Sequence, residues 1–150
     1  MYWEEKIDLL ARQVGPVSLN RHFADWAEIL KRLEDRFINI DSPSRRFSNW
    51  PDALKSPIFI RTTNRKEICN EIGKLDPDRS YWAIFVRGDY PTAKHIVFEC
   101  KPSVIEALLA ITRGDFFIGD KKYNWLVHFK DMMGERVSLI KSGGPPTPFG

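Results

Sequence analysis

The residues that could carry out chemistry together lie between positions 89 and 101. Asp89 is followed, on the next predicted strand, by Glu99-Cys100-Lys101. In such an order two carboxylates could hold a divalent cation while the lysine positions an attacking water. However, Glu99 lies about five residues along a strand that returns from the Asp89 loop, so the carboxylates should be roughly 15 Å apart at ~3.3 Å per residue. A single ion cannot bridge that gap, so we set this hydrolytic site aside.

The histidines offer a second possibility. His22 lies beside the start of a predicted helix, where we expect a surface residue. His95 and His128 lie on predicted strands, and if these strands are neighbours, the pair could bind a metal or transfer a proton together with Glu99. The sequence favours two separate, half-exposed histidines instead. A small metal-binding domain or hydrolase that uses His95, Glu99 and His128 is our alternative function.

No compact catalytic motif is present, whether GxSxG, Walker A, GxGxxG or HExxH. The leading interpretation therefore has no catalytic residue, no metal ligand and no cofactor, and it favours a non-catalytic protein over an enzyme. Cys69 and Cys100 are the only cysteines, and neither belongs to a CxxC pair. We expect both to be buried free thiols.

Two segments could instead contact a partner. The corner Asp120-Lys121-Lys122-Tyr123 is either a solvated turn or, with Trp125 beside it, a patch suited to an acidic partner protein. Residues 41–57 form a predicted long loop whose aromatic residues either pin it to the core or face a partner. The partner-binding residues predicted from the two segments are Phe47, Trp50, Lys121, Lys122 and Tyr123.

Composition limits the class of protein. The 150 residues match one ordinary domain, and 43% hydrophobic with 29% charged residues is typical of a globular chain. The net charge of +3 is by itself neutral evidence. A nucleic-acid interface built from Arg45, Arg46, Lys121 and Lys122 would require these short basic clusters to form one face, so we do not expect a nucleic-acid partner. The acidic beginning of the chain does not resemble a signal peptide, and no apolar run approaches the ~20 residues of a membrane helix. We expect a cytoplasmic protein without membrane contact.

Hydrophobic periodicity predicts the elements that would position these residues. Apolar residues at three- and four-residue steps, or polar residues in capping-box spacing, predict helices over 3–14, 21–37, 65–75 and from 103 to the glycine at 114. Short β-prone runs between turn residues predict strands over 58–62, 81–87, 94–100 and 136–140, with a further hairpin within 115–130.

These elements predict an α+β fold. We expect a mostly antiparallel sheet of about five to six strands with helices packed on it, two of the helices being N-terminal. The strand at 81–87 is apolar on both faces, which fits a central position. Residues 1–141 should form a single domain, and residues 142–150, rich in Gly and Pro, should be a flexible C-terminal tail that builds no core.

The hairpin also carries a family resemblance. Phe116-Phe117-Ile118-Gly119-Asp120-Lys121-Lys122-Tyr123-Asn124-Trp125-Leu126 resembles a block in a family of uncharacterised bacterial proteins, (F/Y)(F/Y)I-x-DKKY-x-WL. The resemblance extends over residues from about 50 to 141, judged by the order of predicted elements. Small proteins with this kind of block are similar to the immunity proteins of bacterial toxin systems, which act by binding.

The resemblance and the lack of an assembled catalytic set lead to one functional expectation. We expect a protein-binding module of the immunity type, whose partner is a toxin or a host factor. Its oligomeric state is left open by the sequence.

Overall fold

The computed structural model describes residues 9–10, 12–13, 19–21, 26–39, 50, 52–85, 97–111, 113–132 and 134–150. Within these ranges the strands are β1 (Leu19–Arg21), β2 (Ile58–Asn64), β3 (Tyr81–Phe85), β4 (Val97–Cys100), β5 (Phe116–Gly119), β6 (Leu126–Asp131) and β7 (Arg136–Lys141). The helical elements are α2 (Trp26–Phe37), the 3₁₀ turn η3 (Arg65–Glu67), α3 (Ile68–Ile72) and α4 (Pro102–Ile111).

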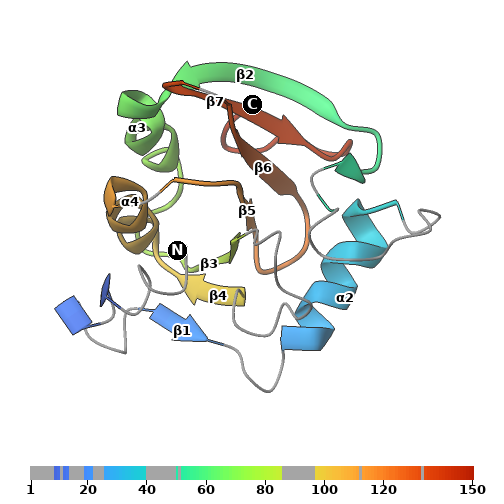
Figure 1. Cartoon of the computed structure of the whole chain (residues 1–150). Helices are drawn as coiled ribbons and strands as arrows, with labels where there is room; N and C mark the ends of the chain where they lie inside the picture. The colour runs from blue at the N-terminus through green and yellow to red at the C-terminus, as the bar shows by residue number, and fades with distance from the viewer. Residues whose placement is uncertain are drawn as a thin grey trace.

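The strands form one seven-stranded sheet in the order β1-β4-β3-β5-β6-β7-β2 (Figure 1). Every neighbouring pair is antiparallel. The predicted α+β class, with a mostly antiparallel sheet and helices packed on it, is confirmed. β3 lies between β4 and β5 with all five of its residues buried, so its apolar character on both faces reflects a central strand, as predicted.

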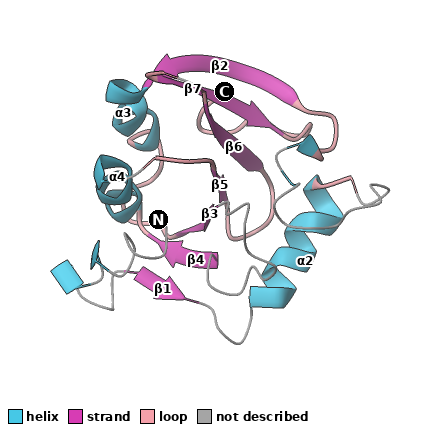
Figure 2. Cartoon of the chain, viewed as in Figure 1, coloured by secondary structure: helices cyan, strands magenta, loops and turns pink. Residues whose placement is uncertain are grey.

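Helices cover the two faces of the sheet separately. Figure 2 shows α3 and α4 on one side of the strands and α2 on the other. Side chains therefore alternate between two cores along each strand. The larger core joins α3 and α4 to Ala83, Phe98 and Phe129, whereas the smaller one joins α2 to Ile84 and Phe117.

Local sequence explains where β2 ends and α3 begins. The side-chain oxygen of Asn64 accepts a hydrogen bond from the Glu67 backbone N–H at 3.0 Å. This is half of the predicted capping box. Glu67 does not return the bond to the backbone, since its carboxylate instead accepts one from the Thr63 hydroxyl at 3.3 Å. The chain therefore makes one 3₁₀ turn before the short α3 begins.

The beginning of the chain departs in part from expectation. Residues 9–10 and 12–13 are helical, within the predicted helix 3–14. The second predicted helix was to begin at residue 21, but Leu19–Arg21 is a strand at the sheet edge that pairs with β4. Three residues are too few to show alternation, so pairing with a distant strand decided their conformation. The predicted loop residues 41–49 and the hairpin connection 86–96 lie outside the described residues.

The last nine residues show the largest difference from the predicted fold. We predicted that residues 142–150 contribute nothing to the core, and this is wrong, because Phe149 is fully buried in the larger core. Its ring meets Trp125 and Phe129 edge-on, with centroids 6.0 and 5.1 Å away. Burial of the large Phe149 ring therefore orders a segment whose Gly and Pro content predicted a flexible tail.

Candidate protein-binding surface

The predicted partner-binding residues separate in the structure. Lys121, Lys122 and Tyr123 lie in the turn between β5 and β6, as the hairpin pattern predicted. Trp50 is only 2% exposed and meets Phe117 edge-on at 5.8 Å. Trp50 belongs to the smaller core, so its side chain is not available to contact a partner. Phe47 lies outside the described residues.

The β5–β6 turn is built around Asp120. The Asp120 carboxylate accepts a hydrogen bond from the Asn124 backbone N–H at 2.6 Å, and the Asp120 carbonyl accepts one from the Tyr123 N–H at 3.1 Å. Tyr123 closes the turn with a φ of 59°. A bulky side chain rarely adopts this left-handed conformation, which costs on the order of 1–3 kcal/mol. Surrounding contacts must therefore hold Tyr123 in place.

Those contacts come from α2 and β3. The centroid of the Tyr123 ring lies 6.4 Å from that of the buried Trp82 on β3. A second contact comes from α2, where the Arg32 guanidinium lies 5.7 Å from the Tyr123 ring centroid. Burial is the largest cause of a raised pKa of the Tyr123 hydroxyl, and the negative charge of Glu28 raises this pKa further. The positive charge of Arg32 and a hydrogen bond with Trp82 lower it, but the net pKa lies above its ordinary value. Tyr123 is thus a half-buried, neutral phenol presented at the surface.

Charged side chains surround this tyrosine. Lys121 forms an ion pair with Glu99 at 2.7 Å and lies 5.4 Å from the Trp82 centroid. Arg32 pairs with Glu28 one helical turn away, also at 2.7 Å. We call the exposed surface formed by these groups the Tyr123 corner, and it consists of Glu28, Arg32, Glu99, Lys121, Lys122 and Tyr123.

The Tyr123 corner is less cationic than the sequence indicated. Two of its three basic side chains are neutralised by carboxylates. Lys122 is exposed and makes no ion pair with the described residues. Trp125 does not join the corner, because it leaves the turn toward the opposite face, where it contacts Tyr81 at 6.0 Å. Only Lys122 therefore offers an uncompensated charge to an acidic group.

The alternative site of His95, Glu99 and His128 is not assembled among the described residues. Strands β3 and β5 separate Glu99 on β4 from His128 on β6, a lateral distance of about 14 Å at ~4.8 Å per strand. His95 is outside the described residues. In the described part of the chain, no group of three His, Cys, Asp or Glu side chains could hold a metal ion.

His128 instead has a structural environment. It is 1% exposed, stacks on Phe117 with centroids 4.6 Å apart, and places Nε2 3.5 Å from the Asp115 carboxylate. Burial raises the pKa of Asp115, but His128, the Asp131 backbone N–H and the Lys130 charge lower it, and the net pKa lies below its ordinary value. This pair ties the start of β5 to β6 beside Phe117 of the smaller core.

The remaining candidates are Asp89, the basic residues Arg45 and Arg46, and the two thiols. Asp89, Arg45 and Arg46 lie outside the described residues, so neither the two-carboxylate site nor the basic face can be described as a unit. Cys100 is buried, and burial, with a smaller effect of Glu99, raises its pKa to about 12. Cys69 is exposed, which corrects the expectation of two buried thiols, because its position on the short α3 faces away from the core.

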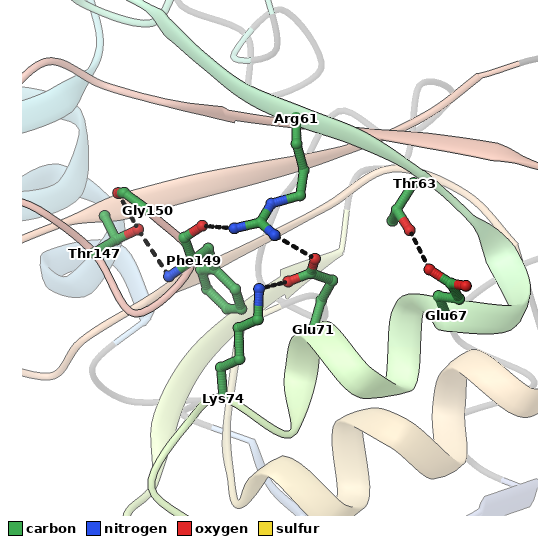
Figure 3. A network of polar contacts seen from close by, with 8 residues as sticks. All are labelled: Arg61, Thr63, Glu67, Glu71, Lys74, Thr147, Phe149 and Gly150. Atoms are coloured by element: carbon green, nitrogen blue, oxygen red, sulfur yellow. Dashed lines mark hydrogen bonds and ion pairs between the residues drawn. The ribbon is translucent and has the colours of Figure 1, made fainter.

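A polar network beside Phe149 was not predicted from the sequence (Figure 3). The Arg61 guanidinium donates to the Phe149 carbonyl and lies 3.3 Å from the Glu71 carboxylate. Glu71 is buried and also pairs with Lys74 at 2.6 Å. A large apolar residue within a Gly- and Pro-rich tail was the only available signal, since periodicity cannot identify a single anchor.

Comparison with protein-family models, with curated proteins and with solved structures gave no match. The resemblance of residues 116–126 to a bacterial family therefore stays a prediction. In the part of the chain described here, no helix has both the length and the apolar character needed to cross a membrane. Fold and surface together define an α+β domain with a strained aromatic corner.

Proposed function

We propose that this chain is a non-catalytic protein-binding module that contacts its partner through the Tyr123 corner. The observation that supports this most is the left-handed backbone of Tyr123. A glycine or asparagine would occupy that position without strain. A bulky aromatic side chain there, at the surface beside Arg32, is the kind of outlier from which a function can be inferred.

The chemistry of the corner suits recognition. Tyrosine, tryptophan and arginine are the residues that most often dominate binding energy at protein interfaces. Tyr123 rests on the buried Trp82 and has few rotatable bonds, so little conformational entropy is lost when a partner covers it. Lys122 adds a free charge at the rim, which would steer a partner carrying an acidic group.

The class of partner follows from the same reasoning. The corner is a small surface around one aromatic anchor, in which two ion pairs lie beside the uncompensated charge of Lys122. Such a surface fits the exposed face of another folded protein better than a small ligand, which needs a concave pocket. A toxin recognised in the manner of an immunity protein, or a host factor, is the proposed partner.

A capture experiment with matched variants tests this function. The full chain is used as bait in extract of its native host under mild crosslinking, and any captured protein is purified for calorimetry. Lys122→Glu should weaken binding by about tenfold or more. Lys66→Glu is the control, because Lys66 is also exposed but lies on η3, which adjoins α3 on the other side of the sheet. Capture of no protein, or equal binding by both variants, would refute the proposal.

A further inference from the structure

Residues 147–150 form a small self-contained unit, which we call the tail knob. The Gly150 N–H donates to the Thr147 carbonyl and the Thr147 N–H donates to the Gly150 carbonyl, each at 3.1 Å. The Thr147 hydroxyl accepts from the Phe149 N–H at 3.2 Å. All of these bonds are internal to the knob. It can therefore keep its shape, with the Phe149 ring projecting, wherever it docks.

The knob fits into a site on the sheet, which we call the socket. Trp125 and Phe129 hold the Phe149 ring by edge-on contacts. Arg61 binds the Phe149 carbonyl (Figure 3). Lys141 Nζ lies 3.4 Å from the Gly150 carbonyl. On the knob itself, these two cations contact only backbone carbonyls. Together with the aromatic walls they therefore recognise a phenylalanine at a fixed distance from two carbonyls.

The connection between knob and sheet is short and weakly attached. Its beginning is fixed where the Gly143 N–H and the Ser142 hydroxyl donate to the Lys55 carbonyl at 3.1 and 2.7 Å. Residues 144–146 are exposed, and Pro145 and Pro146 have no N–H to donate. Gly144 has a φ of 152°, which L side chains rarely adopt. These three residues can change direction without breaking a backbone bond of the sheet.

From these features we infer that the socket also accepts the tail knob of a second copy of this chain, so that two copies exchange residues 147–150 and form a dimer. The knob is the one ligand whose fit to the socket is already seen, and a second copy supplies it unchanged. Reciprocal exchange preserves every knob–socket contact, so its cost is limited to association and to the changed path of residues 144–146.

The length of the connection sets the balance between the two forms. A short tether gives the chain's own knob an effective concentration on the order of millimolar at its socket. Exchange in the natural chain should therefore become appreciable only near millimolar protein. Removing residues 144–146 leaves about 3.8 Å between the α-carbons of Gly143 and Thr147, so the knob can no longer follow its path to its own socket, whereas the socket of a second copy remains available.

Three full chains test this inference by light scattering after size-exclusion chromatography. Protein concentrations run from about 10 µM to about 1 mM, so that they reach the expected transition near millimolar. The dimer fraction should be highest for the chain lacking residues 144–146, lower for the natural chain and lowest for a chain with Gly-Ser-Gly inserted after Gly144. Isotope-filtered nuclear Overhauser contacts between Phe149 and Trp125 of differently labelled copies should appear in the dimer.

Two outcomes would overturn the exchange. The first is a shortened chain that stays folded and monomeric at every concentration. The second is equal dimerisation of all three chains, which would point to another surface. A synthetic Pro-Pro-Thr-Pro-Phe-Gly peptide that binds the shortened chain without dimers forming would also overturn it, because the socket would then serve a segment from another protein. Loss of folding in the shortened chain leaves the natural and extended chains, whose dimer fractions must still differ.

Discussion

Replacing Phe149 by alanine tests directly whether the last residues belong to the folded core. Truncating a fully buried phenylalanine typically costs about 3–5 kcal/mol, through lost transfer energy and the cavity that remains. Phe149 is fully buried between Trp125 and Phe129. The tail can detach instead of leaving a cavity, however, which limits the loss to the free energy of docking the knob. We therefore expect a loss of about 3 kcal/mol.

That loss is large against the ~5–15 kcal/mol that stabilises a typical domain. For a chain of this length, each kcal/mol lowers the melting temperature by roughly 2–4 °C, so Phe149→Ala should melt about 6–12 °C lower. Urea unfolding followed by tryptophan fluorescence gives the free energy, with Trp125 as a reporter of the socket. Pro148→Ala is the control, since Pro148 is exposed and should change stability by about 0.5 kcal/mol or less. A loss below about 1 kcal/mol for Phe149→Ala would refute docking of the tail.

A double-mutant cycle with Arg61 sharpens the result. Arg61 is about two-fifths exposed, so much of its attraction to Glu71 is screened, but it also binds the Phe149 carbonyl. If both residues hold the same docked tail, Phe149→Ala combined with Arg61→Ala should cost at least about 0.5 kcal/mol less than the sum of the single changes. Additive costs would show that Arg61 acts only through Glu71.

Three further predictions concern the hairpin and the thiols. Folding lowers the pKa of Asp115 below its ordinary value of 3.8, so its carboxylate stabilises the fold above that pH. Asp115→Asn should be about 1–2 kcal/mol less stable than the natural chain at pH 7, because the charge beside His128 is lost. Urea titrations should show this difference in stability shrinking as the pH falls below 3.8. A thiol reagent should modify Cys69 alone in the folded protein and Cys100 only after unfolding; two reactive thiols in the native state would contradict this. Tyr123→Gly should be more stable than Tyr123→Ala by about 1 kcal/mol in thermal unfolding, because both lose the ring but only glycine adopts the left-handed backbone without strain; equal stabilities would remove the strain on which the proposed function rests.

The sequence predicted those elements whose signals are local. The β5–β6 hairpin was found because apolar runs flank a polar corner, and the central place of β3 because both of its faces are apolar. β1 was missed, since a three-residue strand is defined by its partner β4 and not by its own pattern. Phe149 was missed for a similar reason, because the socket that buries it comes from residues 20 or more positions upstream, such as Trp125 and Phe129.

The candidate surface shows the same division. Turn chemistry identified Lys121, Lys122 and Tyr123, but not what they touch. Lys121 is neutralised by Glu99, which comes 22 positions earlier in the chain, so counting lysines overstated the positive charge of the corner. Tyr123 contacts Arg32, which lies on α2 in the N-terminal part of the chain. Charge and strain at a surface are properties of the assembled neighbours, and single-sequence patterns do not contain them.

The β5–β6 turn connects both proposals and also keeps them separate. Tyr123 and Trp125 are two positions apart, yet Tyr123 packs against the core beneath α2 and Trp125 against the core that holds Phe149. A substitution at Lys122 therefore changes the corner without touching the socket, and one at Phe149 changes the socket without touching the corner. If Lys122→Glu abolished knob exchange, or a docked partner changed Trp125 fluorescence, the turn itself would have to couple the two faces through Tyr123, whose strained backbone is held by the contacts of its ring with Trp82 and Arg32.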